Sequence, residues 1–180
     1  MKKIETSFEG LYVLETNNFQ DKRGFFQKLF NYDFFKENHL ATDFKEFYFS
    51  LNKKGVRRGM HFQIPPFDHV KVVYVSFGKI LDVVVDLRKG SLTYGKCYSI
   101  ELDDHHAQYL YIPKGFAHGF LSLEENTIVN YAQTTCYNKD CDYGISQDSI
   151  DFDWGTENPI VSGRDLTFPS LSEFESPFTL

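Results

Sequence analysis

The 180-residue sequence predicts an all-β protein, mainly antiparallel, folded as a sandwich or a barrel. Three observations lead to this fold class. Apolar runs are short and rich in β-branched and aromatic residues, turn residues separate them at near-regular spacing, and helical patterns between them are almost absent.

One short helix is expected before the main strands. Residues 32–40 combine apolar pairs with polar residues, and Asn31 or Asp33 can cap the first turn. Strand patterns then follow one another, with turns at Gly78, Gly90 and Gly95 and at two acidic segments. The predicted strands cover residues 47–51, 70–77, 79–87, 96–102, 107–112 and 127–134.

The carboxy-terminal residues 155–180 predict an irregular strap over the barrel, because glycines and prolines interrupt them repeatedly. The chain contains no repeat, linker or low-complexity segment. A chain of 180 residues is large enough for one substantial core, so residues 1–180 are expected to form a single domain.

Composition argues against several classes of protein. The formal charge of −6 argues against binding to nucleic acid or an anionic membrane, since both need a basic surface. The amino terminus lacks the apolar run of a signal peptide, and no stretch is long enough to span a bilayer. Cys97, Cys136 and Cys141 are odd in number and lack CxxC spacing. A reduced, cytoplasmic protein is therefore expected.

Residues 111–120, "YIPKGFAHGF", contain a P-x-G-x-x-H pattern that resembles the second half of the cupin signature, a jelly-roll fold. In metal-binding cupins the first half supplies two histidines and a glutamate. Here it supplies only His61, followed by Phe62 and Gln63, so too few ligands are present for a stable divalent site. We expect no metal, although an iron cupin using His61, Gln63 and His118 is an alternative.

Six polar residues occur on predicted strands whose other side chains are apolar. A buried cation without a partner is costly, so such residues tend to persist where a ligand binds them. They are Arg58, His61, Gln63, Lys71, His118 and Tyr131. A neutral imidazole can act as a general base, an ammonium can stabilise an enolate oxygen, and a tyrosine on the opposite wall can return a proton. Together these groups predict an epimerase that acts next to a carbonyl.

Several stretches extend this prediction to a family. The segments "FQDKRGFF", "RGMHFQIPP", "YIPKGFAHGFLSL" and "VSGRDLTFPSL", in this order, resemble the dTDP-4-dehydrorhamnose 3,5-epimerase family of sugar-nucleotide epimerases over nearly the whole chain. The resemblance implies a cupin-like jelly roll without a cofactor. It also implies a homodimer in which the amino-terminal strands cross to the partner's active site.

The resemblance implies four catalytic residues. His61 matches the base, Asp165 its carboxylate partner, Lys71 the lysine that stabilises the O4 enolate, and Tyr131 the acid on the opposite face. For substrate binding, Arg23 and Arg58 match arginines on the diphosphate, as guanidinium forks suit phosphate oxygens. The remaining expected contacts to the substrate are Phe19, Glu46, Gln63, His118, Tyr137 (stacked on the pyrimidine), Asp142 and Arg164.

Three residues depart from the family pattern at the nucleotide end: Lys28 replaces a glutamate, Glu46 a glutamine and Tyr48 an asparagine. The hypothesis that follows is a compensating ion pair between Lys28 and Glu46. The resemblance implies 3,5-epimerisation of dTDP-4-dehydro-6-deoxy-D-glucose. A C3-only or C5-only epimerase on a dTDP- or CDP-linked sugar, a metal-dependent cupin oxygenase or isomerase, and a non-catalytic sugar-nucleotide-binding protein remain alternatives.

Overall fold

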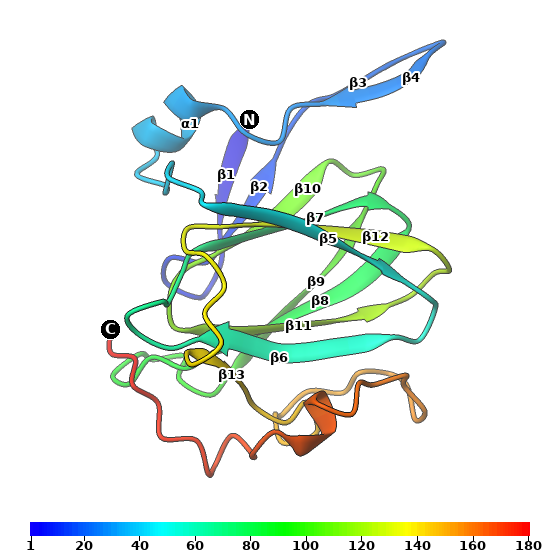
Figure 1. Cartoon of the computed structure of the whole chain (residues 1–180). Helices are drawn as coiled ribbons and strands as arrows, with labels where there is room; N and C mark the ends of the chain where they lie inside the picture. Colours follow the sequence, from blue (N-terminus) through cyan, green and yellow to red (C-terminus); the bar gives the residue numbers. More distant parts are fainter.

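The structure is a computed structural model that describes all 180 residues. Two antiparallel sheets face each other, as in a jelly roll, and a two-stranded hairpin projects from one end (Figure 1). The predicted all-β antiparallel class is therefore confirmed. The only α-helix is short, and the chain contains no helix that is long and apolar enough to cross a bilayer.

In the six-stranded sheet, the strands are not neighbours in the order in which they follow one another along the chain, because several connections cross to the other sheet. It consists of β1 (Lys2–Glu5), β2 (Tyr12–Glu15), β10 (Gln108–Ile112), β7 (Lys71–Phe77), β12 (Thr127–Gln133) and β5 (Glu46–Asn52). The five-stranded sheet consists of β13 (Asp142–Gly144), β6 (Arg57–Gln63), β11 (Phe116–Ser122), β8 (Lys79–Asp86) and β9 (Cys97–Asp103). The hairpin is β3 (Asn18–Asp21) with β4 (Gly24–Gln27). The helices are α1 (Tyr32–Glu37) and the 3-10 helix η1 (Asp165–Thr167).

Three apolar clusters explain why several strands are apolar on both faces. One cluster lies between the sheets and includes Val73, Val84 and Phe120. A second covers the outer face of the five-stranded sheet, where Trp154 and other residues of the carboxy-terminal segment pack. A third covers the outer face of the six-stranded sheet beneath α1. Alternate residues of β7 and β8 therefore enter different cores.

All six predicted strands are present, with boundaries that move by at most one residue. The predicted helix over 32–40 is too long, because α1 ends at Glu37. Asn38 turns its side chain back to the Phe34 carbonyl (2.8 Å), and His39 has a positive φ of 56°, which stops the helix. The cap at Asn31 is confirmed, since its Oδ1 accepts a hydrogen bond from Phe34 N at 2.9 Å.

The carboxy-terminal segment after β13 is mostly irregular and runs along the outer side of the five-stranded sheet (Figure 1, orange to red). Only η1 and two isolated bridges interrupt it with regular structure. This segment matters for the site because η1 brings Asp165 against β6.

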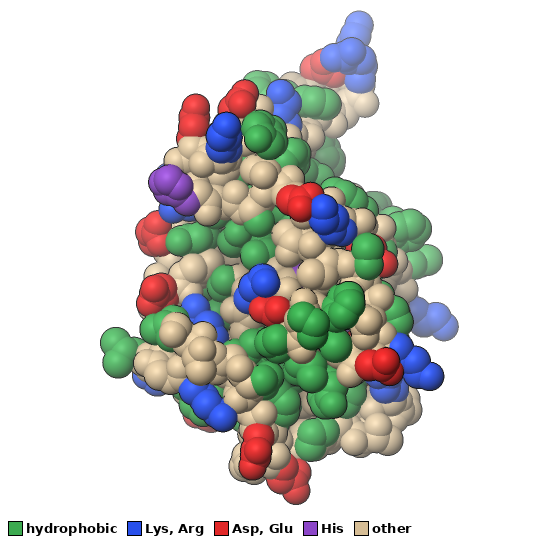
Figure 2. Space-filling model, turned by 60° about the vertical axis from the view of Figure 1, so that its left-hand side comes forward, with side chains coloured by type: hydrophobic (Ala, Val, Ile, Leu, Met, Phe, Trp, Pro, Cys, Tyr) green, Lys and Arg blue, Asp and Glu red, His purple; other side chains and the backbone are tan.

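Two parts of the surface expose large aromatic side chains. The projecting hairpin carries Phe19 and Phe26, which are 60% and 61% exposed. The edge strand β5 turns its polar residues inward and exposes Phe47 and Phe49, at 71% and 68%. Charged side chains are scattered over the face in Figure 2, where red and blue often lie side by side and green patches are exposed between them.

Candidate active site

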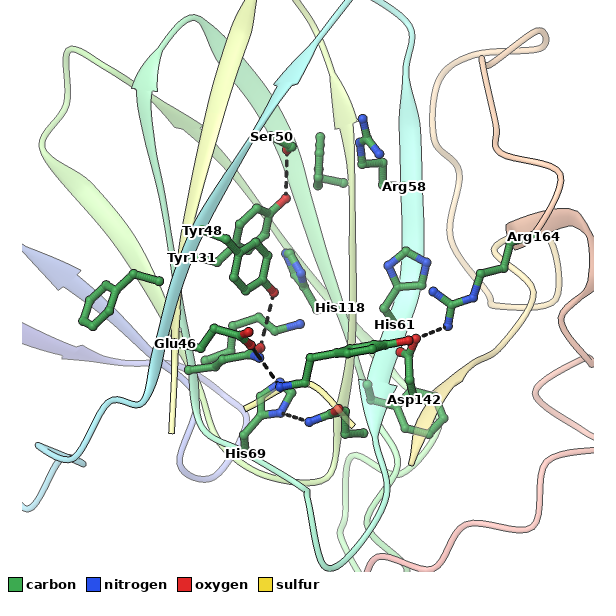
Figure 3. Close-up of a pocket in the computed structure, with 17 residues that line it drawn as sticks. Glu46, Tyr48, Ser50, Arg58, His61, His69, His118, Tyr131, Asp142 and Arg164 are labelled. Carbon is green, nitrogen blue, oxygen red and sulfur yellow. Dashed lines mark hydrogen bonds and ion pairs between the residues drawn. The ribbon is translucent and has the colours of Figure 1, made fainter. Parts of the chain in front are cut away.

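A pocket of about 460 Å³ opens between the two sheets (Figure 3). Side chains from both sheets line it, together with residues of the segments around 69, 137 and 164. Its lining is mixed in character, with aromatic rings beside histidine, lysine, arginine and carboxylate groups. Such a concave site with converging polar groups is typical of a small-molecule binding site.

An irregularity in β6 aims two of these side chains into the pocket. His61 lies opposite His118 of β11, but Arg58 lies opposite Phe120, so three steps on β6 match two on β11. This is a β-bulge, and it turns Arg58 and His61 toward the same side. Gly59 and Gly119 permit the close approach, because a Cβ at Gly59 would lie 2.5 Å from the Gly119 Cα.

His61 is held by a buried carboxylate. Its Nε2 lies 2.9 Å from Asp165 Oδ1, and Asp165 Oδ2 accepts a hydrogen bond from Gly59 N at 3.2 Å. Burial raises the pKa of Asp165, but hydrogen bonds and the charge of His61 outweigh it, so the pKa lies below its usual value. When the ionised Asp165 accepts a hydrogen bond from the Nε2–H group of His61, the Nδ1 lone pair is available as a base.

A second histidine–aspartate pair lies deeper. His118 Nε2 is 2.8 Å from Asp82 Oδ2, and both side chains are buried. Burial lowers the pKa of His118, although the Asp82 charge opposes this effect, so the imidazole is neutral near pH 7.

Lys71 is a buried amine with no hydrogen bond to an acidic partner. Burial lowers its pKa to about 8, while the charges of Asp82 and Asp142 act in the opposite direction. It lines the pocket from the six-stranded sheet, and His118 lines it from the facing five-stranded sheet. A buried ammonium without a close counter-charge is costly, and an anionic oxygen of a ligand would relieve that cost.

Tyr131 faces the pocket from β12, in the sheet opposite His61 (Figure 3). Its ring stacks on Tyr48 with centroids 4.6 Å apart and an angle of 16° between the planes. Its hydroxyl lies 3.3 Å from Ser50 Oγ. Burial raises the pKa of Tyr131, so it is a protonated phenol and a potential acid at neutral pH.

The mouth of the pocket carries an exposed aromatic ring and two carboxylates. Tyr137 is 59% exposed, and its backbone N–H donates to Glu46 Oε2 at 3.1 Å. Arg164 Nη2 pairs with Asp142 Oδ2 at 2.6 Å on the other side. Gln63 accepts a hydrogen bond from Asn138 N and so supports the loop that carries Tyr137.

The structure brings most of the sequence-predicted site residues together. The pocket is lined by His61, Lys71, Tyr131, Glu46, Arg58, Gln63, His118, Tyr137, Asp142 and Arg164. Asp165 lies behind His61 rather than in the lining. Phe19 and Arg23 lie away from the pocket on the projecting hairpin, where Arg23 pairs with Asp21 at 2.6 Å.

The predicted ion pair between Lys28 and Glu46 does not form in the structure of the single chain, so this prediction is wrong. Glu46 Oε2 instead accepts hydrogen bonds from Gln133 Nε2 and from the backbone of Tyr137. Lys28 directly follows β4, and its backbone carbonyl accepts a hydrogen bond from Thr16 Oγ1 at 2.8 Å.

Sequence reasoning missed four polar residues of the site: His69, Asp82, Ser50 and Gln133. Asp82 had a usable signal, because it is a carboxylate flanked on both sides by apolar residues in the run 80–85. Burial and the charge of Lys71 lower the pKa of His69 to about 3, so it is neutral. Ser50 and Gln133 carry no signal in the sequence beyond their inward register on β5 and β12.

No three His, Cys, Asp or Glu side chains of the chain converge as metal ligands do. His61 and His118 each direct Nε2 toward an aspartate, and Gln63 is occupied by the 136–138 loop. What the arrangement offers is a base on one wall, a phenol on the facing wall and a cation in the same pocket. This set can remove a proton from one face of a carbon and return one to the other face.

Comparison with known proteins identifies the family. A sequence profile described as dTDP-4-dehydrorhamnose 3,5-epimerase matches residues 5–173. The chain is 41% identical over 175 residues to the enzyme of that name from Methanothermobacter thermautotrophicus, with 94% of each chain covered. The chain belongs to the dTDP-4-dehydrorhamnose 3,5-epimerase family. This family consists of isomerases, and the resemblance inferred from the sequence motifs is confirmed.

Solved structures of the family agree with the fold. The Bacillus anthracis dTDP-4-dehydrorhamnose 3,5-epimerase, with TDP and PPi bound, has a TM-score of 0.91 at 36% identity and covers 94% of this chain and 99% of its own. The Legionella pneumophila dTDP-6-deoxy-D-glucose-3,5-epimerase, in complex with dTDP-4-keto-L-rhamnose, has a TM-score of 0.91 at 32% identity, with 97% and 94% covered. The cupin-like jelly roll of the epimerase family is therefore the fold of this chain.

Proposed function

We propose that this protein is an epimerase that converts dTDP-4-dehydro-6-deoxy-D-glucose into dTDP-4-dehydro-L-rhamnose, a step in supplying deoxysugar for polysaccharide. One observation carries the proposal: His61, backed by Asp165, and Tyr131 lie on facing sheets of one pocket. The names of the family's characterised members support the reaction class.

The proposed mechanism uses the acidity of carbons next to the C4 ketone. His61 Nδ1 removes the proton at C3 or C5, and the Lys71 ammonium stabilises the negative charge that develops on O4. Tyr131 then delivers its hydroxyl proton to the opposite face, which inverts that carbon. Water afterwards protonates the Tyr131 oxygen and accepts the proton held by His61, so protons and charge balance in each turnover. Repeating the cycle at the second carbon gives the 3,5-epimer.

The nucleotide is expected to lie toward the mouth of the pocket. Arg58 is an exposed guanidinium suited to the diphosphate, and Tyr137 offers an exposed ring for stacking on the pyrimidine. The Arg164–Asp142 pair supplies one donor group and one acceptor group nearby. We favour a dTDP-linked sugar because a relative binds TDP, and Glu46 is the residue most able to change that preference.

We also propose a cytoplasmic homodimer in which the amino-terminal strands of one copy complete the active site of the other. The exposed rings of Phe19 and Phe47 support this, since large apolar side chains at this exposure favour burial in an interface. The Arg23 side chain on the hairpin is 84% exposed. We propose that it reaches the active site of the second copy and binds the substrate there. Residues 1–180 would then form a single domain, and each active site would combine most of one copy with the amino-terminal strands of the other.

The test of the function is isotope incorporation. The protein is incubated in heavy water with dTDP-4-keto-6-deoxyglucose, and in parallel with the CDP-linked sugar, and the sugar is analysed by nuclear magnetic resonance. We expect deuterium at both C3 and C5 of the dTDP-linked sugar, with inversion. Label at one carbon alone would reassign the protein as a monoepimerase, and no label with either sugar would contradict the proposal.

A further inference from the structure

We propose that Ser50 is a positioning residue for the acid, and that it ends a one-directional hydrogen-bond relay from Arg58 through Asn52 and Ser50 to Tyr131. The relay rests on the proposed function, because it assigns how the acid of that reaction is oriented and supported. It connects the guanidinium at the diphosphate end of the pocket with the phenol that protonates the sugar carbon.

The first link fixes the orientation of the Asn52 amide. Arg58 Nε lies 2.8 Å from Asn52 Oδ1, and a guanidinium nitrogen can only donate a hydrogen bond. The Asn52 oxygen must therefore face Arg58. The amide nitrogen, on its other side, donates to the carbonyl oxygens of Ser50 and Thr127 at 3.0 and 3.1 Å, which agrees with this orientation.

The second link fixes the direction at Ser50. Asn52 Nδ2 also lies 3.0 Å from Ser50 Oγ, so one of its two hydrogens is shared between this oxygen and the Ser50 carbonyl oxygen. An amide nitrogen has no lone pair free to accept a hydrogen bond, so the Ser50 hydroxyl can only accept from it. The hydrogen of the Ser50 hydroxyl is then left for another partner.

The last link reaches the acid. Tyr131 Oη lies 3.3 Å from Ser50 Oγ, and the contact is drawn as a dashed line in Figure 3. Either oxygen can be the donor in this contact; in the proposed relay the Ser50 hydroxyl, which already accepts from Asn52, donates its own hydrogen to Tyr131 Oη. The phenolic hydrogen of Tyr131 is therefore free to point into the pocket, toward the substrate. Once that proton has been delivered, the Ser50 hydroxyl supports the negative oxygen that remains.

The strand register makes this relay possible. Tyr48, Ser50 and Asn52 alternate on β5 and face inward, opposite Tyr131, Val129 and Thr127 of β12. Tyr48 stacks on the Tyr131 ring and limits its tilt, while Ser50 meets its hydroxyl. Asn52 is only 2% exposed, so its amide is shielded from competing water. The relay therefore has a defined route and a dry environment.

The test measures how the enolate is partitioned. In heavy water, reprotonation by His61 returns labelled starting sugar, whereas protonation by Tyr131 gives labelled inverted product. We compare the ratio of the two for wild type, Ser50→Ala and Ser50→Thr, with Ser76→Ala as a matched control. Ser76 Oγ also meets an asparagine amide, Asn130 Nδ2 at 2.8 Å, but it is an exposed residue and does not line the pocket.

Loss of one hydrogen bond to the acid should lower the ratio of inverted to retained sugar about tenfold in Ser50→Ala. Exchange into the starting sugar should persist, because it needs His61 and Lys71 but not Tyr131. Ser50→Thr, which keeps the hydroxyl, and Ser76→Ala should have the wild-type ratio. A wild-type ratio in Ser50→Ala, or loss of exchange and inversion together, would overturn the relay alone. A wild-type protein that incorporates no deuterium would overturn the proposed function and the relay with it.

Discussion

His61 and His118 lie opposite each other on neighbouring strands, and each forms a hydrogen bond with an aspartate through Nε2. Their surroundings differ. The side chain of His61 is 32% exposed to the pocket, whereas that of His118 is 5% exposed. A base must gain a positive charge during the reaction, and burial opposes that charge more strongly at His118. His61 is therefore the better base, and His118 is better suited to hydrogen bonding as a neutral ring.

The carboxylate behind His61 gives the first prediction. Asp165→Asn removes the charge that stabilises the imidazolium and can impose the wrong tautomer on His61. We expect kcat to fall by about a hundredfold or more while the protein stays folded, as steady-state kinetics and circular dichroism would establish. Asp148→Asn is the control, because Asp148 pairs with Arg57 outside the pocket. Equal losses in the two variants would count against a specific role for Asp165.

The second prediction concerns pH. Burial lowers the pKa of Lys71 to about 8, and the proposed role needs the protonated ammonium. The active form is therefore lost as pH rises, so kcat/KM should decline through about pH 8. Lys71→Arg keeps its charge throughout this range, so its profile should lack the decline even if its rate is lower. The same decline in Lys71→Arg would assign that limb of the profile to another group.

The residues that sequence motifs predicted are those whose types are themselves reactive or charged, such as His61 and Lys71. Ser50 and Gln133 were not predicted as site residues, because a serine or a glutamine on a strand is not part of any distinctive sequence pattern. Their importance comes from the register of β5 on β12, which joins residues about eighty positions apart. Such pairing depends on the whole sheet and cannot be deduced from local spacing.

At the scale of elements, the bulge in β6 is the feature that aims Arg58 and His61 together. Gly119 lies opposite it, and a Cβ there would come within 2.6 Å of Met60 Sδ and 2.7 Å of the Arg58 carbonyl oxygen. The backbone contact cannot yield easily, since both strands are paired on each side.

We therefore predict that Gly119→Ala lowers the free energy of unfolding by about 1–3 kcal/mol and also lowers activity, because it displaces β6. Denaturant unfolding and kinetics measure the two effects. Gly163→Ala is the control, since no heavy atom lies within 4 Å of its added Cβ and its φ is unstrained. Unchanged stability and activity in Gly119→Ala would mean that the bulge adapts without cost.

Six strands were predictable because their β-branched and aromatic runs are bounded by turn residues, and the structure shifts their ends only slightly; β6 and β11 were not delimited. The hairpin of β3 and β4 was not delimited in advance, since its residues are exposed and follow no burial period. Strand β5 was found as a strand, but its polar face is the inward one. That inversion follows from the pocket, which a local pattern does not reveal.

At the scale of the whole molecule, the chain holds a nearly complete site but keeps Phe19 and Arg23 at a distance from it. The proposed exchange of amino-terminal strands predicts that two inactive variants can restore each other. His61→Ala and Arg23→Ala are unfolded together and refolded as a mixture. If Arg23 acts in the partner's pocket, mixed dimers contain one site with both residues intact, and activity returns.

The control for this experiment is the same pair of variants refolded separately and mixed afterwards, which should stay near the activity of Arg23→Ala alone. Size-exclusion chromatography with light scattering confirms the dimer in each sample. If Arg23 served the pocket of its own chain, no mixed dimer would regain a complete site. Co-refolding would then give no more activity than the control.

In the proposed mechanism the two walls of the pocket protonate opposite faces of the sugar. The most direct measurement is the fate of label and configuration when Tyr131→Phe and His61→Ala act on dTDP-4-keto-6-deoxyglucose in heavy water. We predict that Tyr131→Phe still introduces deuterium at C3 and C5 with retained configuration, and that His61→Ala introduces none. Inverted product formed by Tyr131→Phe at the wild-type rate, or normal exchange by His61→Ala, would contradict the assignment of acid and base.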